Sequence, residues 1–360
     1  MIKKDILVID GAMVSRSPHV SMYLHILDHN NLSYDVAVWN RKGDDISNMP
    51  NNYMIYNHPT EDDYPAWRKL LSIYQFYKFV RSTALKRQYS AIVIFEIANA
   101  FFFLPFLKNK YRYKYIFDIR DYSPFMRIIY GQIVVSRLIQ NSYTTVISSR
   151  GFQNWLPKSD KFTISHNIDI GIFQALIKTH FTPINKCVTI LTIGNLRDPH
   201  INCFIAKSFS NNPKYKMRFV GDGAALPIIQ AFCMKNKINN VSYYGHYQKQ
   251  DEVSFYKQAD IINCCMEDNM LSNYLMSNRI YLAALLQKPI LCNEGSYQSS
   301  VIEKFHLGCI VHKNENPRTC LENYLDTFDY NTYCDGRTAF LNMIAVEQQV
   351  FSSKLINLVK

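Results

Sequence analysis

Apolar runs of strand length alternate along this chain with stretches of helical periodicity. In the first half the runs lie at 6–9, 34–38, 91–95, 113–117 and 144–147. A second series lies at 188–193, 217–220, 240–244, 261–262 and 289–291. Strands that alternate with helices favour a parallel sheet covered by helices. Because the runs are almost continuously apolar, both faces of such sheets are expected to be buried.

The two series predict two Rossmann-like domains. We place the first domain at residues 1–175 and the second at 186–336, with a helix at 337–360. A polar stretch at 178–186 separates the two series, and a chain of 360 residues suits two domains of ordinary size. All nine cysteines follow residue 186, which agrees with a boundary near that position.

The composition narrows the class of partner. The net charge is +11, and an excess of basic residues suits nucleic acid, an anionic membrane surface or a diphosphate. Since no nucleic-acid-binding signature occurs, we expect no nucleic-acid partner. The cysteines are odd in number and include no C-x-x-C, so they indicate neither a disulfide framework nor a zinc site.

The chain is expected to be cytoplasmic or peripheral at the inner face of a membrane. Its N-terminus runs directly into an apolar strand and has no apolar core of signal-peptide length. The longest apolar stretch, 97–107, is too short to span a bilayer, which needs about 20 apolar residues.

The segment 263–291 carries the most informative motif. It reads as a strand end, a polar loop, a helix that opens near Asn278, and Lys288-Pro289 before another strand. In open α/β folds such loops form the ligand-binding edge of the sheet. Four shorter pieces precede it in order, each near a strand end: 194–197, 219–223, 241–247 and 256–262. Their glycines let the backbone approach a ligand closely, and helix N-termini attract phosphate oxygens.

Together these pieces resemble the donor-binding half of GT-B glycosyltransferases, in particular the family-4 type of bacterial surface-polysaccharide pathways. The resemblance implies an α/β chain with the GT-B fold, in which two Rossmann-like domains face a central cleft and a terminal helix returns to the first domain. It also implies transfer of a sugar from a nucleotide-diphosphate donor, a UDP-sugar first of all. The acceptor would be a lipid-linked saccharide or oligosaccharide of capsule, O-antigen or exopolysaccharide synthesis. Family analogy favours retention of configuration, without a metal or other cofactor.

The resemblance assigns roles to particular residues. Arg197 would neutralise the departing diphosphate, although a surface charge is the alternative interpretation. Asn278 would lie beside the sugar and diphosphate, or would cap a helix, or both. The full set of donor-side residues in the second half is Gly194, Asn195, Gly221, Gly223, His246, Tyr247, Asn278 and Arg279.

One expected feature of the family is missing. The two positions of the family's Glu-x7-Glu pair are occupied here by Tyr274 and Leu282. A leucine cannot accept a hydrogen bond from a ribose hydroxyl. Nearby carboxylates that would substitute are Glu267, Asp268 and Glu294. The gap also motivates an alternative: a catalytically inactive GT-B scaffold that binds a membrane or a partner. A GT-B epimerase or phosphorylase is a third alternative.

In the first half, the strand end Asp118-Ile119-Arg120-Asp121 would face the acceptor. Arginine cannot serve as a general base, so Asp118 or Asp121 is the better candidate for contact with the incoming hydroxyl and Arg120 for stabilising charge. Structural Asp–Arg pairing is the alternative. The loop with Gly11 and Arg16 would close over the cleft, and these two residues would contribute to donor binding. Glu96 is a lesser candidate.

A basic, aromatic segment at 67–89 predicts contact with an anionic membrane surface. Six of its residues are Lys or Arg and none is acidic. Leu70, Ile73, Tyr77, Val80 and Ala84 form one helical stripe, and Leu71 and Phe79 lie outside it. Such helices suit an anionic interface. The segment 101–114, in which phenylalanines precede basic residues, is a second candidate contact. Ordinary core helices are the alternative for both.

Overall fold

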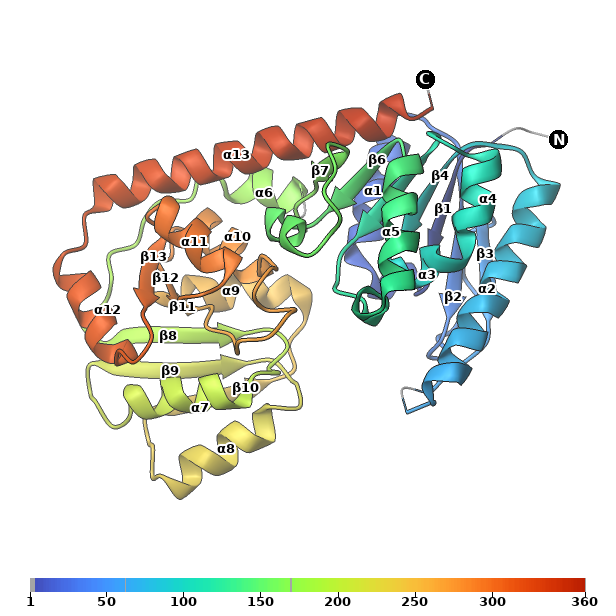
Figure 1. Ribbon diagram of the computed structural model, residues 1–360. Coiled ribbons are helices and arrows are strands. Elements are labelled where there is room, and N and C mark those ends of the chain that lie inside the picture. Colours follow the sequence, from blue (N-terminus) through green and yellow to red (C-terminus); the bar gives the residue numbers. More distant parts are fainter. Residues whose placement is uncertain (1–3, 62, 169, 360) are drawn as a thin grey trace. The chain divides into compact units, whose positions relative to one another are not determined.

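The computed structural model describes residues 4–61, 63–168 and 170–359. The chain divides into two compact units (Figure 1). The first unit comprises Met1–Asn167 and Val346–Lys360, and the second comprises Ile168–Ala345. We describe each unit by itself.

The first unit is built on a parallel sheet of seven strands in the order β3-β2-β1-β4-β5-β6-β7. Its strands are β1 (Lys4–Asp10), β2 (Tyr34–Asn40), β3 (Tyr53–Asn57), β4 (Tyr89–Phe95), β5 (Tyr115–Ile119), β6 (Thr144–Ile147) and β7 (Phe162–Ile164). Its helices are α1 (Pro18–His29), α2 (Ala66–Lys86), α3 (Ile97–Ala100), α4 (Leu104–Lys110) and α5 (Ile129–Asn141), with 3-10 turns η1 (Val14–Arg16), η2 (Phe101–Phe103), η3 (Pro124–Arg127) and η4 (Arg150–Asn154).

The second unit repeats this topology with six parallel strands in the order β10-β9-β8-β11-β12-β13. Its strands are β8 (Val188–Ile193), β9 (Tyr215–Val220), β10 (Val241–Gly245), β11 (Ile261–Asn263), β12 (Ile290–Asn293) and β13 (Gly308–Val311). Its helices are α6 (Ile170–Leu176), α7 (Pro199–Ser208), α8 (Leu226–Lys235), α9 (Glu252–Lys257), α10 (Asn278–Leu285), α11 (Tyr297–Lys304) and α12 (Pro317–Asp326), with the 3-10 turn η5 (Lys249–Asp251).

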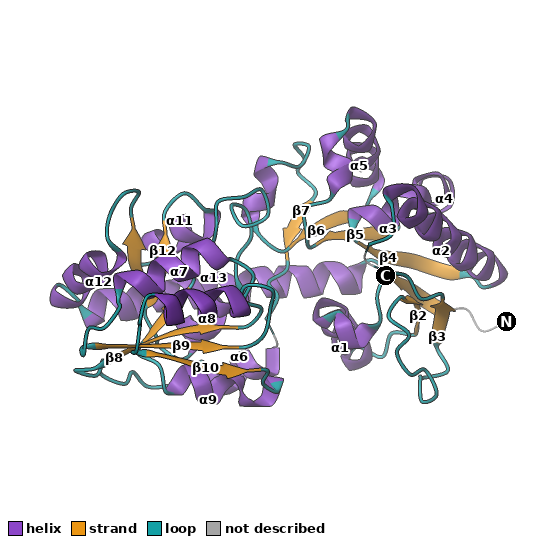
Figure 2. Cartoon of the chain, turned by 90° about the horizontal axis from the view of Figure 1, so that it is seen from below, coloured by secondary structure: helices purple, strands orange, loops and turns teal. Residues whose placement is uncertain are grey.

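Helices cover both faces of each sheet, as Figure 2 shows, and this sandwich explains the continuous apolar strands. In the first unit one buried cluster joins β1, β2 and β4 to α1. Tyr23 of α1 packs edge-on against Phe95 of β4, with ring centroids 5.0 Å apart. In the second unit, buried clusters lie on the two sides of the sheet. The prediction of parallel α/β sheets buried on both faces is confirmed.

The last helix, α13 (Tyr330–Asn357), contributes to both units. In the second unit Arg337 is buried and its Nε donates to the carbonyl of Ala284 at 2.6 Å. In the first unit Phe351 is fully buried in the cluster around α1, and Glu347 bonds His166 Nε2 at 2.7 Å. The helix therefore begins seven residues before the predicted position 337, and its final turns belong to the core of the first unit.

The sequence pattern missed three strands, and all three lie at sheet edges: β3, β7 and β13. An edge strand has one neighbour only and is less deeply buried, so its sequence carries a weaker apolar run. Tyr53–Asn57, for example, has only one buried residue. The predicted strand at 113–117 is found at Tyr115–Ile119. The division of the chain at 167 precedes the predicted boundary at 175 by eight residues.

Helix α2 buries a different set of residues from the predicted stripe, of which only Ile73, Val80 and Ala84 are buried. Its buried residues are Ser72, Ile73, Phe76, Val80 and Ala84, whereas Leu70 is exposed. The helix ends at Lys86 because Arg87 adopts an extended backbone that leads into β4. The helix predicted over 67–89 is therefore found at 66–86.

Candidate functional site

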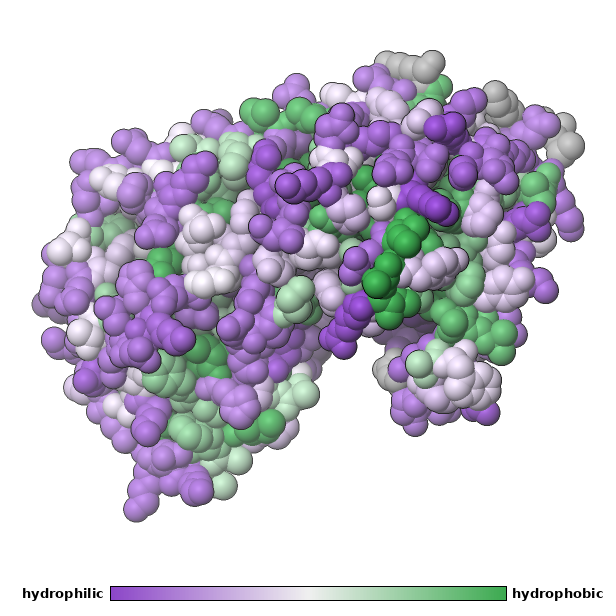
Figure 3. All heavy atoms as spheres, viewed as in Figure 1, coloured by the Kyte–Doolittle hydropathy of each residue, from purple (hydrophilic) through white to green (hydrophobic). Residues whose placement is uncertain are grey.

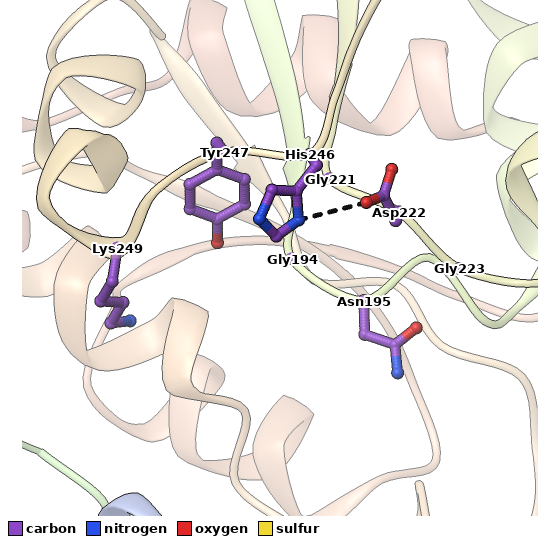
Figure 4. Close-up of a pocket in the computed structure, with 8 residues that line it drawn as sticks. All are labelled: Gly194, Asn195, Gly221, Asp222, Gly223, His246, Tyr247 and Lys249. Carbon is purple, nitrogen blue, oxygen red and sulfur yellow. Dashed lines mark ion pairs between the residues drawn. The ribbon is translucent and has the colours of Figure 1, made fainter. Parts of the chain in front are cut away.

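Six of the sequence-predicted residues come together at one pocket of the second unit. The pocket has a volume of about 440 Å³ and lies at the carboxyl ends of β8, β9 and β10 (Figure 4). Its lining comprises Gly194, Asn195, Gly221, Asp222, Gly223, His246, Tyr247 and Lys249. Asp222 and Lys249 had not been assigned to the site. Carboxyl ends of parallel strands are where open α/β sheets bind ligands.

Glycines shape this pocket in two ways. Gly194 has φ of +104°, and a Cβ built there would meet no atom within 4 Å, so the space beside it is open. Gly221 has φ of +116°, and its Cβ would stand 2.1 Å from the carbonyl oxygen of Gly194. The loop after β9 therefore packs directly on the loop after β8. Only glycine allows both this conformation and this approach.

Polar side chains from the loop after β10 complete the pocket. His246 Nδ1 lies 3.2 Å from Asp222 Oδ2, a pair that Figure 4 marks with a dashed line. Tyr247 Oη donates to Glu252 Oε1 at 3.1 Å, and Lys249 also pairs with Glu252. Glu252 thus fixes the two side chains that form this end of the pocket.

The side chain of Arg279 bridges the carboxyl ends of the neighbouring strands β8 and β11. It is the second residue of α10, and its Nε donates to the carbonyl of Ile193 at the end of β8, at 2.6 Å. Its Nη1 donates to the carbonyl of Asn263 at the end of β11, at 3.2 Å. Nη2 has no hydrogen-bond partner in the described parts of the chain. Because the strand order reverses between β8 and β11, this arginine holds a positive charge at the switch point of the sheet.

The structure separates the two interpretations of Asn278. The N-cap of α10 is Ser277, whose Oγ accepts from the amide of Arg279 at 3.4 Å. Asn278 is the first residue of the helix and is exposed. The capping role predicted for Asn278 is therefore wrong, and its side chain remains available at the helix N-terminus.

Arg197 lies in the loop after β8 and does not line the pocket. Its side chain is 42% exposed, and Nε stands 4.0 Å from Asp198 Oδ2. Burial raises the pKa of Asp198, and the nearby Arg197 guanidinium opposes that shift. The contact to Asp198 is loose and the side chain is largely exposed, so Arg197 is held only weakly by the fold.

The carboxylates proposed to replace the missing glutamate pair already have partners. Glu267 Oε1 accepts from the amide of His200 in the first turn of α7, at 2.8 Å. Asp268 accepts from Asn273 Nδ2 at 2.7 Å, and Glu294 pairs with His312 at 2.8 Å. Leu282 is buried in the core of the second unit. Each of these groups serves local structure.

In the first unit, Asp118 and Arg120 form a buried ion pair at the end of β5. Arg120 donates to both oxygens of Asp118, each at 2.6 Å, and Tyr23 Oη also donates to Asp118 at 2.6 Å. A further bond joins Arg120 Nη1 to the carbonyl of Ser165 at 2.9 Å. Asp118 is fully buried. This geometry agrees with the alternative interpretation, in which Asp118 and Arg120 pair to stabilise the fold. Of Asp118 and Asp121, only Asp121 is exposed.

The remaining predicted residues of the first unit lie around the end of β1. Gly11 lies against Asn99, whose Oδ1 would be 2.3 Å from a Cβ on Gly11. Arg16 is exposed and donates to Asp44, with Nε 2.8 Å from Oδ2. Glu96 follows β4, beside β1 in the sheet. Among the described residues there is no group of three or more His, Cys, Asp or Glu side chains placed to hold a metal ion.

The fold is that of known glycosyltransferases. The chain is similar to sucrose-phosphate synthase from Thermosynechococcus elongatus, with a TM-score of 0.70, 10% identity, and coverage of 99% of this chain and 98% of that one. It is similar to Anabaena HepE, solved in complex with UDP, with a TM-score of 0.70, 11% identity and coverage of 98% and 100%.

A third similar structure is the lipopolysaccharide outer core galactosyltransferase WaaB, with a TM-score of 0.66, 12% identity and coverage of 98% and 99%. No protein-family model and no curated protein matches the sequence. At these identities the likeness defines the fold: the chain has the GT-B architecture of two Rossmann-like domains, as the sequence predicted.

Proposed function

We propose that this protein is a glycosyltransferase that uses a nucleotide-diphosphate sugar, a UDP-sugar first of all. The observation that carries the proposal is the pocket in the loops after β8, β9 and β10 of the second unit, in a chain that aligns over its whole length with HepE, a protein solved with UDP. The loop around His246 and Tyr247 suits a nucleoside base, while Gly194 leaves open space for the ribose and phosphates.

The cationic groups near this pocket suit the diphosphate. Arg279 keeps Nη2 available at the switch point while its other nitrogens bond two strand ends. Arg197, whose side chain is partly exposed in the loop after β8, would supply a second positive charge to a leaving group that gains negative charge. The reaction we propose is transfer to a lipid-linked saccharide or oligosaccharide of surface-polysaccharide synthesis, with retained configuration and without a metal or cofactor. Similarity to WaaB, a lipopolysaccharide galactosyltransferase, supports this setting.

Nucleotide binding tests the proposal directly. A thermal-shift screen of UDP, GDP, dTDP and CMP should show a rise in melting temperature with UDP, since a ligand that binds only the folded state stabilises it. Calorimetry then measures Kd. If no nucleotide binds at millimolar concentration, the inactive scaffold becomes the better description; burial of Leu282 where the family places a glutamate is the observation in its favour.

Arg197→Ala separates catalysis from folding. Because the side chain is partly exposed and makes only a 4.0 Å contact with Asp198, its loss should leave stability nearly unchanged, while turnover at saturating donor should fall by about 10²-fold or more. Arg318→Ala removes an arginine of α12, outside the loops after β8, β9 and β10, and should retain full turnover. Equal turnover by Arg197→Ala and the wild type would remove Arg197 from the mechanism.

We also propose that the first unit docks on an anionic membrane. The described helices include none that is long and apolar enough to cross a bilayer. Instead, an apolar surface runs from α2 to α5. Tyr74 contacts Phe102 at 5.3 Å, and Phe101 contacts Tyr130 at 5.8 Å, between ring centroids. Its exposed members are Trp67, Leu70, Leu71 and Tyr74 on α2 and Ile128, Ile129, Tyr130 and Ile133 on and beside α5.

Figure 3 shows a column of apolar side chains over α5, an element that sequence reasoning did not include in the membrane surface. The segment 101–114 contributes less than predicted, because Phe103, Phe106 and Leu107 are buried in the core. Helix α2 also carries the exposed basic residues Arg68, Lys69, Lys78 and Arg81, and basic residues favour an anionic interface.

Vesicle sedimentation tests this docking. Ile129→Glu places a charge at a residue that is 76% exposed and should abolish binding to vesicles that contain anionic lipid. Met234→Glu on α8, at 79% exposure in the second unit, is the matched control and should bind normally. If both variants sediment like the wild type, α5 is not part of the membrane surface.

A further inference from the structure

Helix α10 connects the pocket of the second unit to residues that lie outside it. At its N-terminal end, Arg279 bonds the carbonyl of Ile193, the residue before Gly194 of the pocket. The helix has only eight residues, so a contact that holds its C-terminal end also bears on the place of Arg279. The last four carbonyl groups of a helix have no partner within it and need donors from elsewhere.

Arg337 of α13 supplies such donors. Its Nε donates to the carbonyl of Ala284 at 2.6 Å, and its Nη2 donates to the carbonyl of Leu285 at 3.3 Å. Nη2 also donates to the carbonyl of Ile177, in the segment between α6 and β8, at 2.9 Å. One guanidinium thus joins the end of α10 both to α13 and to the segment that precedes β8.

The charge of Arg337 is buried without an acidic partner. Its side chain belongs to a residue that is 6% exposed, and no carboxylate in the described parts of the chain pairs with it. Burial lowers the pKa of the guanidinium, because desolvation disfavours the charged form. The negative end of the α10 dipole faces this charge and offsets the cost. An apolar side chain would fill the space without that cost, so Arg337 has its effect through its hydrogen bonds.

Gln287, two residues after the end of α10, forms a second tie. Its Nε2 donates to the carbonyl of Thr179, and its Oε1 accepts from Tyr330 Oη of α13 at 3.4 Å. The residue has φ of 53°, in the left-handed region where helices commonly end on glycine. Its side chain therefore bonds the same two elements as Arg337: the segment between α6 and β8, and helix α13.

Close packing fixes the part of α13 that carries Arg337. A Cβ on Gly336 would collide with the carbonyl of Phe305, the residue that follows α11. Only a glycine allows the helix to approach this closely. Because Gly336 immediately precedes Arg337, the backbone that carries the guanidinium is held against the second unit independently of α10.

We propose that Arg337 and Gln287 are positioning residues for the nucleotide site. They contact no ligand; they hold the C-terminal end of α10, so that Arg279 at the other end stays at the ends of β8 and β11. If only a fraction of the molecules holds Arg279 in place, a diphosphate binds more weakly by that fraction. The effect on nucleotide binding rests on the proposed function, whereas the effect on α10 does not.

Hydrogen exchange of the full chain without ligand, followed by mass spectrometry, tests the hold on α10. Gln287→Gly removes the second tie but suits the φ of 53°, so the melting temperature should change little. Peptides from 277–282, at the far end of the helix, should nevertheless exchange about threefold faster, as expected for a lost hydrogen bond. Lys237→Gly, with φ of 51° at the same position after α8, is the matched control and should leave 277–282 unchanged.

Nucleotide affinity, measured by calorimetry, tests the positioning role. Arg337→Met removes every side-chain donor to α10 and should weaken UDP binding by about tenfold or more. Arg337→Lys restores the charge through a single nitrogen and should recover part of that loss. Glu347→Gln alters the tie of the same helix in the first unit, where Glu347 bonds His166, and should bind UDP as the wild type does. If Arg337→Met does not fold, Gln287→Gly and Arg337→Lys decide the question.

Wild-type exchange at 277–282 in Gln287→Gly and in the Arg337 variants would overturn the proposal. Faster exchange confined to 283–288 would overturn it too, since Arg337 and Gln287 would then be a local cap. Unchanged UDP affinity in variants that exchange faster at 277–282 would remove the positioning role. If the wild type itself binds no UDP, the proposed function fails, and exchange at 277–282 alone decides whether these residues hold Arg279.

Discussion

The two sheets of this protein share one strand order and carry opposite chemistry where that order reverses. In the second sheet, Arg279 bonds the ends of β8 and β11, and glycine loops open the edge beside it. In the first sheet, Asp10 and Glu96 stand at the ends of β1 and β4. One switch point presents a cation and the other presents carboxyls.

This difference shows that topology fixes where a ligand binds and side chains fix which ligand it is. An arginine with open backbone loops suits the anionic part of a nucleotide sugar. The same fold, used twice, thus carries chemically distinct groups at its two switch points.

The largest expected effect concerns the buried ion pair between Asp118 and Arg120 at the end of β5. Asp118→Asn leaves the buried Arg120 charge without its partner and should lower the free energy of unfolding by about 3–5 kcal/mol. Urea denaturation measures this. Asp44→Asn breaks the exposed pair with Arg16 and should cost far less, because solvent screens an exposed ion pair. Similar losses in the two variants would mean that Asp118 is not an essential counter-charge.

Gly221→Ala tests the close packing of the glycine-containing loops that follow β8 and β9 in the second sheet. The new Cβ would meet the carbonyl of Gly194 at 2.1 Å in a backbone conformation with φ of +116°, so we expect a loss of about 2–4 kcal/mol together with weaker UDP binding. Gly43→Ala, with φ of +70° and open surroundings, should cost about 1 kcal/mol. Unaltered UDP affinity in Gly221→Ala would separate this loop from the nucleotide site.

A smaller effect comes from the pH dependence of Asp10. Burial raises its pKa from 3.8 to about 6 in the folded state. Between these values the unfolded chain loses the proton and the folded chain keeps it, so stability falls as pH rises. Raising the pH from 4.5 to 7 should remove about 2 kcal/mol through this group.

The difference in unfolding free energy between the wild type and Asp10→Asn isolates this contribution, because every other group titrates in both proteins. The asparagine side chain retains an oxygen that accepts from Ser17, so that the packing is preserved. A pH-independent difference would show that Asp10 ionises in the folded protein as it does in the unfolded chain.

Much of the architecture could be predicted from the sequence. The central strands of both sheets are buried on two faces, so their apolar runs are clear in the sequence. The motifs after β8, β9 and β10 identified six of the eight residues that line the pocket. Lys249 was missed because a lone lysine in a loop carries no signal. Its proximity to Tyr247, and the Glu252 that holds both, were the only available hints.

The sequence by itself determined the strands, their parallel class and the positions of the glycine turns, because burial and backbone conformation act on neighbouring residues. Only the tertiary structure decided which charges meet. Asp118 accepts a hydrogen bond from the hydroxyl of Tyr23, 95 residues away, whereas Glu96 accepts none from the described parts of the chain. Both side chains nevertheless come from strand ends of similar sequence. Hydrogen bonds depend on distance and direction in space, and a linear pattern specifies neither.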